Sequence, residues 1–245
     1  MTRGRRARSV LLVGLCVALT VAFSALGVWQ VQRRAWKLDL IARVEQRIHA
    51  QPAPTPGPAR WASLTQASDG YRRVSLTGVY DHRDETLVQA VTELGPGFWV
   101  MTPLRTDAGF TVLVNRGFIP TERRRPETRS AGQVQGRVAV VGMLRLSEPR
   151  GGFLRRNQPG EERWYSRDVT AIARTRGLAD VAPYFVDADA KPNPGGWPRG
   201  GLTVVRFPNS HLIYALTWFG LALLTGGAAV HVVIDARRTR LEEAE

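Results

Sequence analysis

The sequence predicts an α+β membrane protein, in which a transmembrane helix near each end of the chain flanks a mainly antiparallel β domain with one packed helix. Two observations predict this fold. Residues 9–32 and 212–234 contain no Asp, Glu, Lys or Arg, and at about 1.5 Å per helical residue each run would cross a bilayer core of roughly 30 Å. Between them, short apolar segments alternate with turn residues, as is typical of strands.

We interpret the first apolar run, residues 9–32, as a retained membrane anchor. Four arginines lie within residues 1–8, and Ala-Leu-Gly at residues 25–27 resembles a cleavage site, so a cleaved signal peptide is the alternative. The run is long for a signal peptide, however. It continues without a turn signal into residues 29–37, whose Trp and basic side chains are typical of a membrane interface.

Charge around the two runs predicts which side of the membrane the β domain occupies. Arginines precede the first run and follow the second, so by the positive-inside rule residues 1–8 and the tail, residues 235–245, are cytoplasmic. The basic residues of segment 33–47 oppose this orientation, but charges that lead into a long translocated domain count less. We therefore predict a two-span protein of the cell membrane, with residues 60–210 extracytoplasmic and residues 211–234 forming the second span.

Small residues recur at helical spacing in both apolar runs. Because no water drives association inside a bilayer, membrane helices pack where small side chains let two backbones approach. We therefore predict that the spans pair through these residues; the alternative is that small residues are simply frequent in membrane helices. They are Gly14, Ala18, Ala22 and Ala25 in the first run, and Ala222, Gly226 and residues 227–229 in the second.

The segment 33–59 predicts a helix at the membrane interface followed by a proline-rich spacer. Apolar residues from Leu38 to Ile48 repeat at near-helical spacing. Four prolines then fall within residues 52–58, where they favour an extended chain.

The β domain, residues 60–210, predicts a mainly antiparallel sheet, open or closed into a small barrel, with one helix packed on it. Strand-like runs are separated by Gly, Pro, Asp and Asn at hairpin spacing. A helix over residues 166–176 would end at Gly177, a residue suited to a C-cap. The expected strands are residues 73–80, 86–91, 98–104, 111–119, 137–146, 184–186 and 203–207, the last two on either side of a Pro/Gly-rich loop.

The net charge of +13 does not indicate a nucleic-acid-binding protein. Residues 1–59 hold nine basic and two acidic residues, so much of the excess flanks the first span, where it would meet anionic lipid head groups. Only Lys37 and Lys191 are lysines among 34 basic residues, an arginine bias that we attribute to a GC-rich genome. The one cysteine, Cys16, lies in the first run, so the β domain can form neither a disulfide nor a cysteine-ligated metal site.

No combination of residues predicts catalysis, so we do not expect an enzyme. The sequence has no G-x-S-x-G elbow, phosphate-binding glycine loop or H-E-x-x-H motif. Asp187 and Asp189 alternate near a predicted strand end, and we interpret them as solvated loop carboxylates rather than an acid/base pair. The histidines lack the spacing of metal ligands; they are His49, His82, His211 and His231.

A distinctive motif occupies residues 114–120, with the sequence Val-Asn-Arg-Gly-Phe-Ile-Pro. A glycine and a proline near the end of a strand are typical of a bulge followed by strand termination. We therefore predict a strand that ends in a glycine bulge, with Arg116 paired to an acid.

His211 is the residue to which we assign chemistry. Asn209 or Ser210 could cap a helix that begins there, so the imidazole would lie at the outer membrane interface. It is a candidate axial ligand for haem; the alternative is an interfacial histidine bonded to the β domain. His231 lies about 30 Å further along the same helix and could not ligate the same iron within one chain. The stripe that starts at His211 continues through Tyr214, Trp218, Ala222 and Thr225.

These motifs together resemble the surfeit locus protein 1 family. At the first span the matching residues are Gly-Val-Trp-Gln at 27–30, followed by Arg33, Trp36 and Lys37. In the β domain they are Thr-Pro-Leu at 102–104 and the motif at 114–120. At the second span they are Pro-Asn-Ser-His-Leu-Ile-Tyr-Ala-Leu-Thr-Trp-Phe-Gly at 208–220, a highly specific block. The resemblance frames nearly the whole chain, although residues 147–183 and the tail after 234 match little.

The resemblance implies two spans, an extracytoplasmic domain and no catalysis. It also implies an assembly factor, or chaperone, in the biogenesis of aa3-type cytochrome c oxidase (respiratory complex IV), whose haem-a-containing subunit would be the partner. Some members of the family are thought to handle haem a, and the family's histidine at the head of the second span falls on His211. Tyr214 and Trp218 would then form a haem-facing or packing surface, and the haem a synthesis machinery would be a further partner.

Two other functions are alternatives to transient haem a binding or delivery. The first is a pure scaffold that holds the oxidase subunit without touching the cofactor. The second is an extracytoplasmic enzyme or sensor anchored by two helices, against which the lack of a nucleophile–base or metal pattern counts.

Overall fold

The computed structural model describes residues 3–149, 155–203, 205 and 207–242. The chain divides into two compact units, one formed by residues 1–42 with 206–245, and one by residues 43–205. They are a pair of long helices and a β domain, and each is described by itself. The combination confirms the predicted α+β class.

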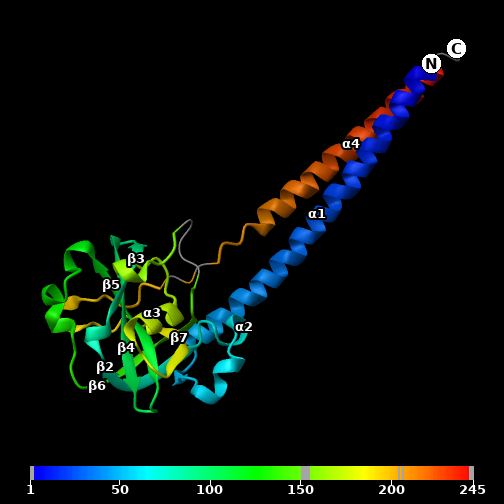
Figure 1. Cartoon of the computed structure of the whole chain (residues 1–245). Coiled ribbons are helices and arrows are strands. Elements are labelled where there is room, and N and C mark those ends of the chain that lie inside the picture. The colour runs from blue at the N-terminus through cyan, green and yellow to red at the C-terminus, as the bar shows by residue number, and fades with distance from the viewer. Residues whose placement is uncertain (1–2, 150–154, 204, 206, 243–245) are drawn as a thin grey trace. The chain divides into compact units, whose positions relative to one another are not determined.

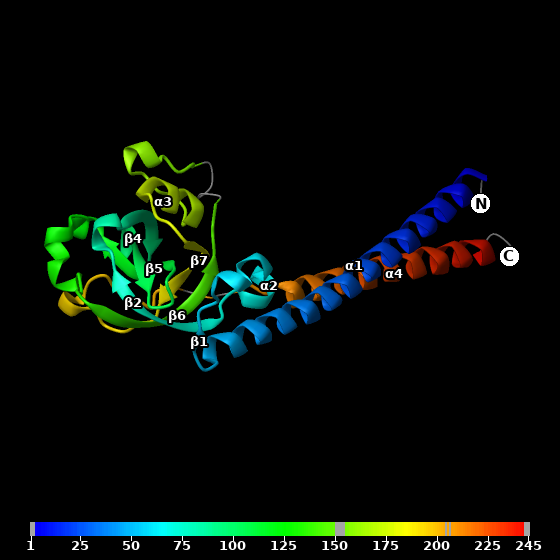
Figure 2. The same cartoon turned by 60° about the horizontal axis from the view of Figure 1, so that its bottom comes forward.

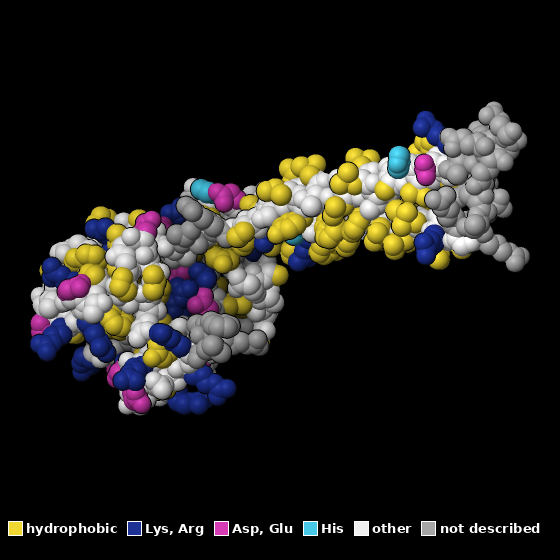
Figure 3. Space-filling model, turned by 90° about the horizontal axis from the view of Figure 1, so that it is seen from above, with side chains coloured by type: hydrophobic (Ala, Val, Ile, Leu, Met, Phe, Trp, Pro, Cys, Tyr) yellow, Lys and Arg dark blue, Asp and Glu magenta, His cyan; other side chains and the backbone are white. Residues whose placement is uncertain are grey.

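The helical unit consists of two long antiparallel helices, α1 (Arg3–His49) and α4 (His211–Glu242). They run side by side in opposite directions (Figures 1 and 2). Both are long and apolar enough to cross a membrane, over Ala7–His49 and His211–Arg238. Hydrophobic side chains cover the helix pair, while most charged side chains in the same view lie over the β domain (Figure 3). The exposed apolar surface of the helices is that of a membrane protein.

The contact face between the helices differs in part from the predicted one. Ala222 and Gly226 lie at the contact as predicted, because Ala222 is buried and a methyl group on Gly226 would reach the Thr20 side chain. On α1, however, the predicted small residues at 14, 18, 22 and 25 are exposed, so that part of the prediction is wrong. The true face lies on roughly the opposite side of α1, at about 100° per residue, and contains Thr20 and Gly27.

Three interactions explain why α1 presents this face. The hydroxyls of Thr20 and Thr225 are 2.9 Å apart and hydrogen-bonded, which is favourable where no water competes. The rings of Phe23 and Trp218 stack with centroids 5.6 Å apart. A Cβ atom on Gly27 would lie 2.6 Å from the ring of Phe219, so only glycine admits this ring. The hydroxyl pair, the stacked rings and the glycine that admits Phe219 therefore decide the face of α1, and the other small residues of the run do not.

A cysteine cross-link distinguishes the observed face from the predicted one. With Cys16 replaced by serine, the pair Thr20→Cys and Thr225→Cys is expected to form a disulfide in most molecules under mild oxidation, because the native hydroxyls already touch. The matched control combines Ala18→Cys, on the exposed side of α1, with Thr225→Cys, and should stay largely reduced. Free thiols counted by maleimide–PEG labelling in membranes give the readout. Equal cross-linking of both pairs would contradict the observed face.

The β domain is built on a closed barrel. Its strands form one sheet in the order β1-β2-β6-β7-β5-β4-β3, and an additional β2–β4 pairing closes the ring. The β5–β7 and β1–β2 pairs are parallel and the others antiparallel, which confirms the mainly antiparallel sheet and its barrel form. The strands are β1 (Ala53–Pro54), β2 (Arg73–Tyr80), β3 (Thr86–Thr92), β4 (Gly95–Thr106), β5 (Thr111–Pro120), β6 (Arg137–Leu146) and β7 (Val181–Ala188).

Two segments depart from the sequence-based expectations. The proline-rich stretch is extended as predicted, and its residues Ala53 and Pro54 pair with β2 as β1. No strand forms at 203, 205 or 207, so the predicted strand at 203–207 is wrong for its described part; 204 and 206 lie outside the described residues. Short 3-10 helices occur at Pro58–Ser63, His82–Asp84, Thr121–Arg123, Pro126–Gly132, Pro159–Glu161 and Pro194–Gly196.

Two further helices belong to the β domain, α2 (Gln66–Asp69) and α3 (Val169–Arg176). The predicted helix at 166–176 starts three residues late, because the side chain of Asp168 caps it by accepting a hydrogen bond from the Ala171 amide. It ends as predicted at Gly177, whose φ of 63° is the left-handed C-cap conformation.

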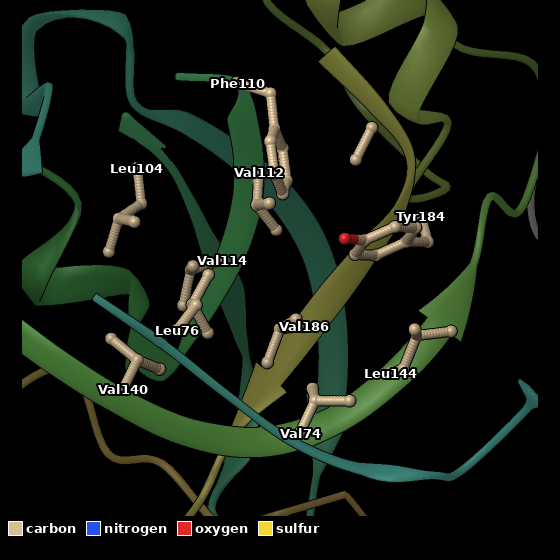
Figure 4. Packing of buried hydrophobic residues seen from close by; sticks show 11 residues of the cluster. Val74, Leu76, Leu104, Phe110, Val112, Val114, Val140, Leu144, Tyr184 and Val186 are labelled. Carbon is tan, nitrogen blue, oxygen red and sulfur yellow. The ribbon is translucent and has the colours of Figure 1, made fainter. Parts of the chain in front are cut away.

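The core has two layers that share strand β5. Inside the barrel, apolar side chains from several strands point toward one another (Figure 4). On the other face of the sheet, Val169 and Ile172 of α3 pack on a second cluster that includes Leu113 and Trp164. Strand β5 is therefore buried on both faces. The barrel cluster includes Val74, Leu76, Leu104, Phe110, Val112, Val114, Val140, Leu144, Tyr184 and Val186.

Candidate functional site

His211 is the first residue of α4 and is held by the neighbouring helix. Its ring atom Nδ1 lies 2.7 Å from Oε1 of Gln30 on α1. An amide oxygen only accepts hydrogen bonds, so Nδ1 carries a proton and donates it; in the neutral ring Nε2 then keeps its lone pair. No described residue hydrogen-bonds to Nε2.

Gln30 fixes this arrangement because it is itself held in place. Its side chain is only 8% exposed. It lies on the same contact face of α1 as Thr20 and Gly27, further along the helix. A histidine whose one nitrogen is hydrogen-bonded by a buried partner, and whose other nitrogen is free, has the arrangement of a metal-ligating imidazole. The helix pair thus holds the imidazole in one orientation, with Nε2 away from the hydrogen bond to Gln30.

The aromatic residues near His211 fall into two groups. Trp218 stacks on Phe23 and belongs to the helix contact. Tyr214 is 55% exposed, on the outer surface of α4. Because residues three apart share one side of a helix, Tyr214 flanks the imidazole on the exposed surface, while Trp218 supports the helix pair one turn further on.

Sequence reasoning proposed His211, Tyr214 and Trp218 as site residues, and it assigned no structural role to Gln30 or Phe23, which contact His211 and Trp218. The signal for Gln30 was present, since it is one of few hydrogen-bonding side chains at the end of an apolar run. Asn209, one of the two residues predicted to cap α4, does not cap it, because its Oδ1 is buried without a hydrogen-bond partner. His231 is exposed twenty residues further along α4.

The motif at 114–120 forms the predicted bulge. Across the β4–β5 pair, Trp99 faces Phe118 and Met101 faces Asn115, so two residues of β5 stand opposite one of β4. Gly117, one of the two, has φ +126°. Asn115 stabilises the bulge, because its Oδ1 accepts a hydrogen bond from the Gly117 amide.

Arg116, the other bulged residue, does not have the predicted acid partner. Its side chain is buried, and its Nη2 donates to the carbonyl of Gly132 and to Oδ1 of Asn193. The guanidinium lies over the ring of Tyr80, 4.9 Å from its centroid. Among the residues that the structure describes, no carboxylate lies within ion-pair distance of Arg116, so the prediction of an acid partner is wrong. The nearby Glu85 is taken by Arg129.

The interpretation of Asp187 as a solvated loop carboxylate is also wrong. Asp187 is 1% exposed and accepts hydrogen bonds from Asn115 (2.7 Å), Arg145 (3.1 Å) and Arg167 (3.1 Å). Two guanidinium groups and an amide neutralise it, so it ties β5, β6 and β7 together. Asp189 is partly exposed and pairs with Arg73. No group of three His, Cys, Asp or Glu side chains suited to a metal occurs in the described parts of the chain.

The sequence model of the SURF1 family matches residues 17–223, which include Gln30, His211 and the whole β domain. The chain belongs to the SURF1 family. The match confirms the resemblance that the motifs indicated, and it extends across residues 147–183, where the motifs gave little guidance.

Curated proteins of the SURF1 family match over most of this chain. Surfeit locus protein 1 of Homo sapiens is 40% identical over 225 residues, which cover 84% of this chain and 72% of the human protein. Surfeit locus protein 1 of Mus musculus is 42% identical over 217 residues, 82% of this chain and 68% of the mouse protein. That of Takifugu rubripes is 39% identical over 218 residues, 82% of this chain and 88% of the fish protein.

Proposed function

We propose that this protein is a non-catalytic membrane assembly factor for aa3-type cytochrome c oxidase, and that it assists maturation of the haem-a-containing subunit by holding haem a transiently. The proposal rests on one observation, the hydrogen bond by which Gln30 orients His211 and leaves Nε2 free. Family membership supports the assembly role, because the motifs at 27–30 and 208–220 carry the resemblance that implies it.

The residues around His211 fit a haem as cargo. Nε2 of His211 would be the axial ligand, and Gln30 would hold the ring in the ligating tautomer. Tyr214 offers an exposed aromatic ring on the same side of α4 for the edge or face of a macrocycle. The bound iron centre would supply the redox-active group that the oxidase uses, while this chain supplies one ligand and an apolar surface.

The same proposal includes an orientation in the cell membrane. Residues 1–8 and 235–245 would be cytoplasmic, and the β domain extracytoplasmic, because arginines flank the ends of both apolar runs. His211, at the start of α4, would then lie at the outer interface. The oxidase subunit and the haem a synthesis machinery are the partners that this position favours, and the lipid bilayer surrounds the helix pair.

Deletion of the gene tests the assembly role. Cells that lack the protein are expected to lose assembled oxidase and its haem a absorbance, while their other cytochromes stay at wild-type levels. Oxidase activity and difference spectra of membranes measure this, and the intact gene supplied in trans should restore both. Normal haem-a-containing oxidase in the deletion strain would refute the proposal.

A further inference from the structure

The β domain contains a pocket that is remote in sequence from His211 and has no part in the proposed function. It encloses about 410 Å³ beside the bulge of β5, within the range of small-molecule sites. Strand β6 forms one wall, and the loop that follows β7 forms another. Its polar lining is Tyr80, Arg116, Arg137, Asp189, Lys191 and Asn193.

Positive charge is in excess in this pocket. Arg137 is paired with Asp107, and Asp189 with Arg73, so these two residues are neutralised. Arg116 and Lys191 remain, and no described carboxylate forms an ion pair with either. Arg116 is buried, and Lys191 is exposed at the rim of the pocket.

Arg116 is the unusual member because its charge is buried and no described carboxylate forms an ion pair with it. The side chain is 2% exposed, and burial lowers the pKa of its guanidinium below the usual value. Nη2 has two acceptors, but Nη1 is buried with no hydrogen-bond partner. A buried charged donor without an acceptor is costly, and a carboxylate is its usual complement.

The neighbouring groups cannot supply the missing negative charge. Burial raises the pKa of Tyr80 to about 12, so its phenol is neutral at pH 7. Glu85 is engaged by Arg129, whose Nη1 donates to Oε2 at 3.0 Å. Asp187 is already shared by Arg145 and Arg167. The counter-charge that Arg116 lacks must therefore come from outside the described protein groups.

We propose that this pocket binds a small molecule that carries a carboxylate or phosphate group, with the anionic oxygens bonded to Arg116 and attracted by Lys191 at the rim. A planar guanidinium matches either group in a bidentate geometry, and hydrogen bonds between two charged groups are stronger than those between neutral groups. The size of the pocket fits a metabolite or one lipid head group.

Binding measurements on the full chain in neutral detergent test the proposal. The probes are citrate, inorganic phosphate and dihexanoyl phosphatidate, titrated by calorimetry at fixed ionic strength with chloride as the blank. At least one probe is expected to bind saturably with one site per chain. A preference for citrate assigns a carboxylate ligand, for free phosphate a soluble phosphate, and for phosphatidate a lipid head group. Absence of saturable binding by all three would overturn the proposal.

Variants locate the site. Arg116→Gln is expected to weaken binding at least tenfold, because it removes the charge and both Nη donors. Lys191→Gln should weaken it about threefold through lost attraction at the rim, and since this side chain is exposed, the variant should fold normally. Arg163→Gln, at an arginine 58% exposed and outside the pocket, is the matched control and should bind as the wild type.

The same variants can also contradict the proposed site. Equal weakening by Lys191→Gln and Arg163→Gln would mean that the anion is attracted by general surface charge, and would overturn the site. If Arg116→Gln fails to fold, as a thermal melt would reveal, the comparison of Lys191 with Arg163 decides alone. His211→Ala should leave anion binding unchanged, so this inference and the haem proposal succeed or fail separately.

Discussion

Replacing His211 with alanine is expected to remove the haem a absorbance from protein purified out of cells that synthesise haem a. In the proposed haem site Nε2 of His211 would be the axial ligand, and alanine has no group that could coordinate the iron. The haem content per chain, measured by the pyridine haemochrome method, should fall at least tenfold.

Two controls separate ligation from general disturbance of α4. Gln30→Leu keeps the histidine but removes its hydrogen-bond acceptor, and loss of such a supporting partner typically lowers metal affinity about 10- to 100-fold. His231→Ala alters an exposed histidine of the same helix and should keep the full haem content. A His211→Ala protein with an unchanged spectrum would refute the ligand assignment and favour the scaffold alternative, in which the oxidase subunit co-purifies from cells unable to make haem a.

Sequence reasoning succeeded where the physical cause is local. The strands at 73–80 and 137–146 were predicted to the residue, because alternation and flanking turn residues fix both ends. The bulge at Gly117 followed from a glycine and a proline near a strand end. The start of the second long helix at residue 211 was also predicted, because a polar residue at the start of an apolar run is conspicuous.

Sequence reasoning failed where the outcome depends on partners distant in the chain. Gln30 and His211 are separated by 181 positions, and nothing in either segment alone specifies that they meet. The predicted contact face of α1 was wrong because contacts with α4, such as that between Gly27 and Phe219, decide which face is buried. Arg116 and Asp187 were both misjudged because the partners that decide them are distant in the chain. Arg145 of β6 and Arg167 before α3 neutralise Asp187. Arg129 takes Glu85, the acid near Arg116.

Substituting Gly117 by alanine is expected to destabilise the β domain by roughly 2–6 kcal/mol, through two additive causes. A φ of +126° is a conformation that L-residues rarely adopt, with a cost of order 1–3 kcal/mol. A Cβ atom there would also overlap the backbone carbonyl of Arg199, a main-chain atom that cannot turn aside, and such overpacking costs about 1–3 kcal/mol. The same backbone pairs with Phe118 through two 2.9 Å hydrogen bonds, so relieving the overlap would break them.

Gly136→Ala is the matched control, because it isolates the backbone conformation from the close approach. Gly136 also has positive φ, +78°, but a Cβ atom there would meet nothing within 4 Å, so alanine should cost only about 1–2 kcal/mol. Chemical unfolding of the full chain in detergent, followed by the fluorescence of its tryptophans, which include the buried Trp164, measures both. If the two variants lose equal stability, the contact with Arg199 contributes nothing. Glycine would then be required at position 117 only because of its positive φ. A larger loss for Gly117→Ala means that the bulge requires glycine so that the Arg199 backbone can pack against it beside the Arg116 pocket.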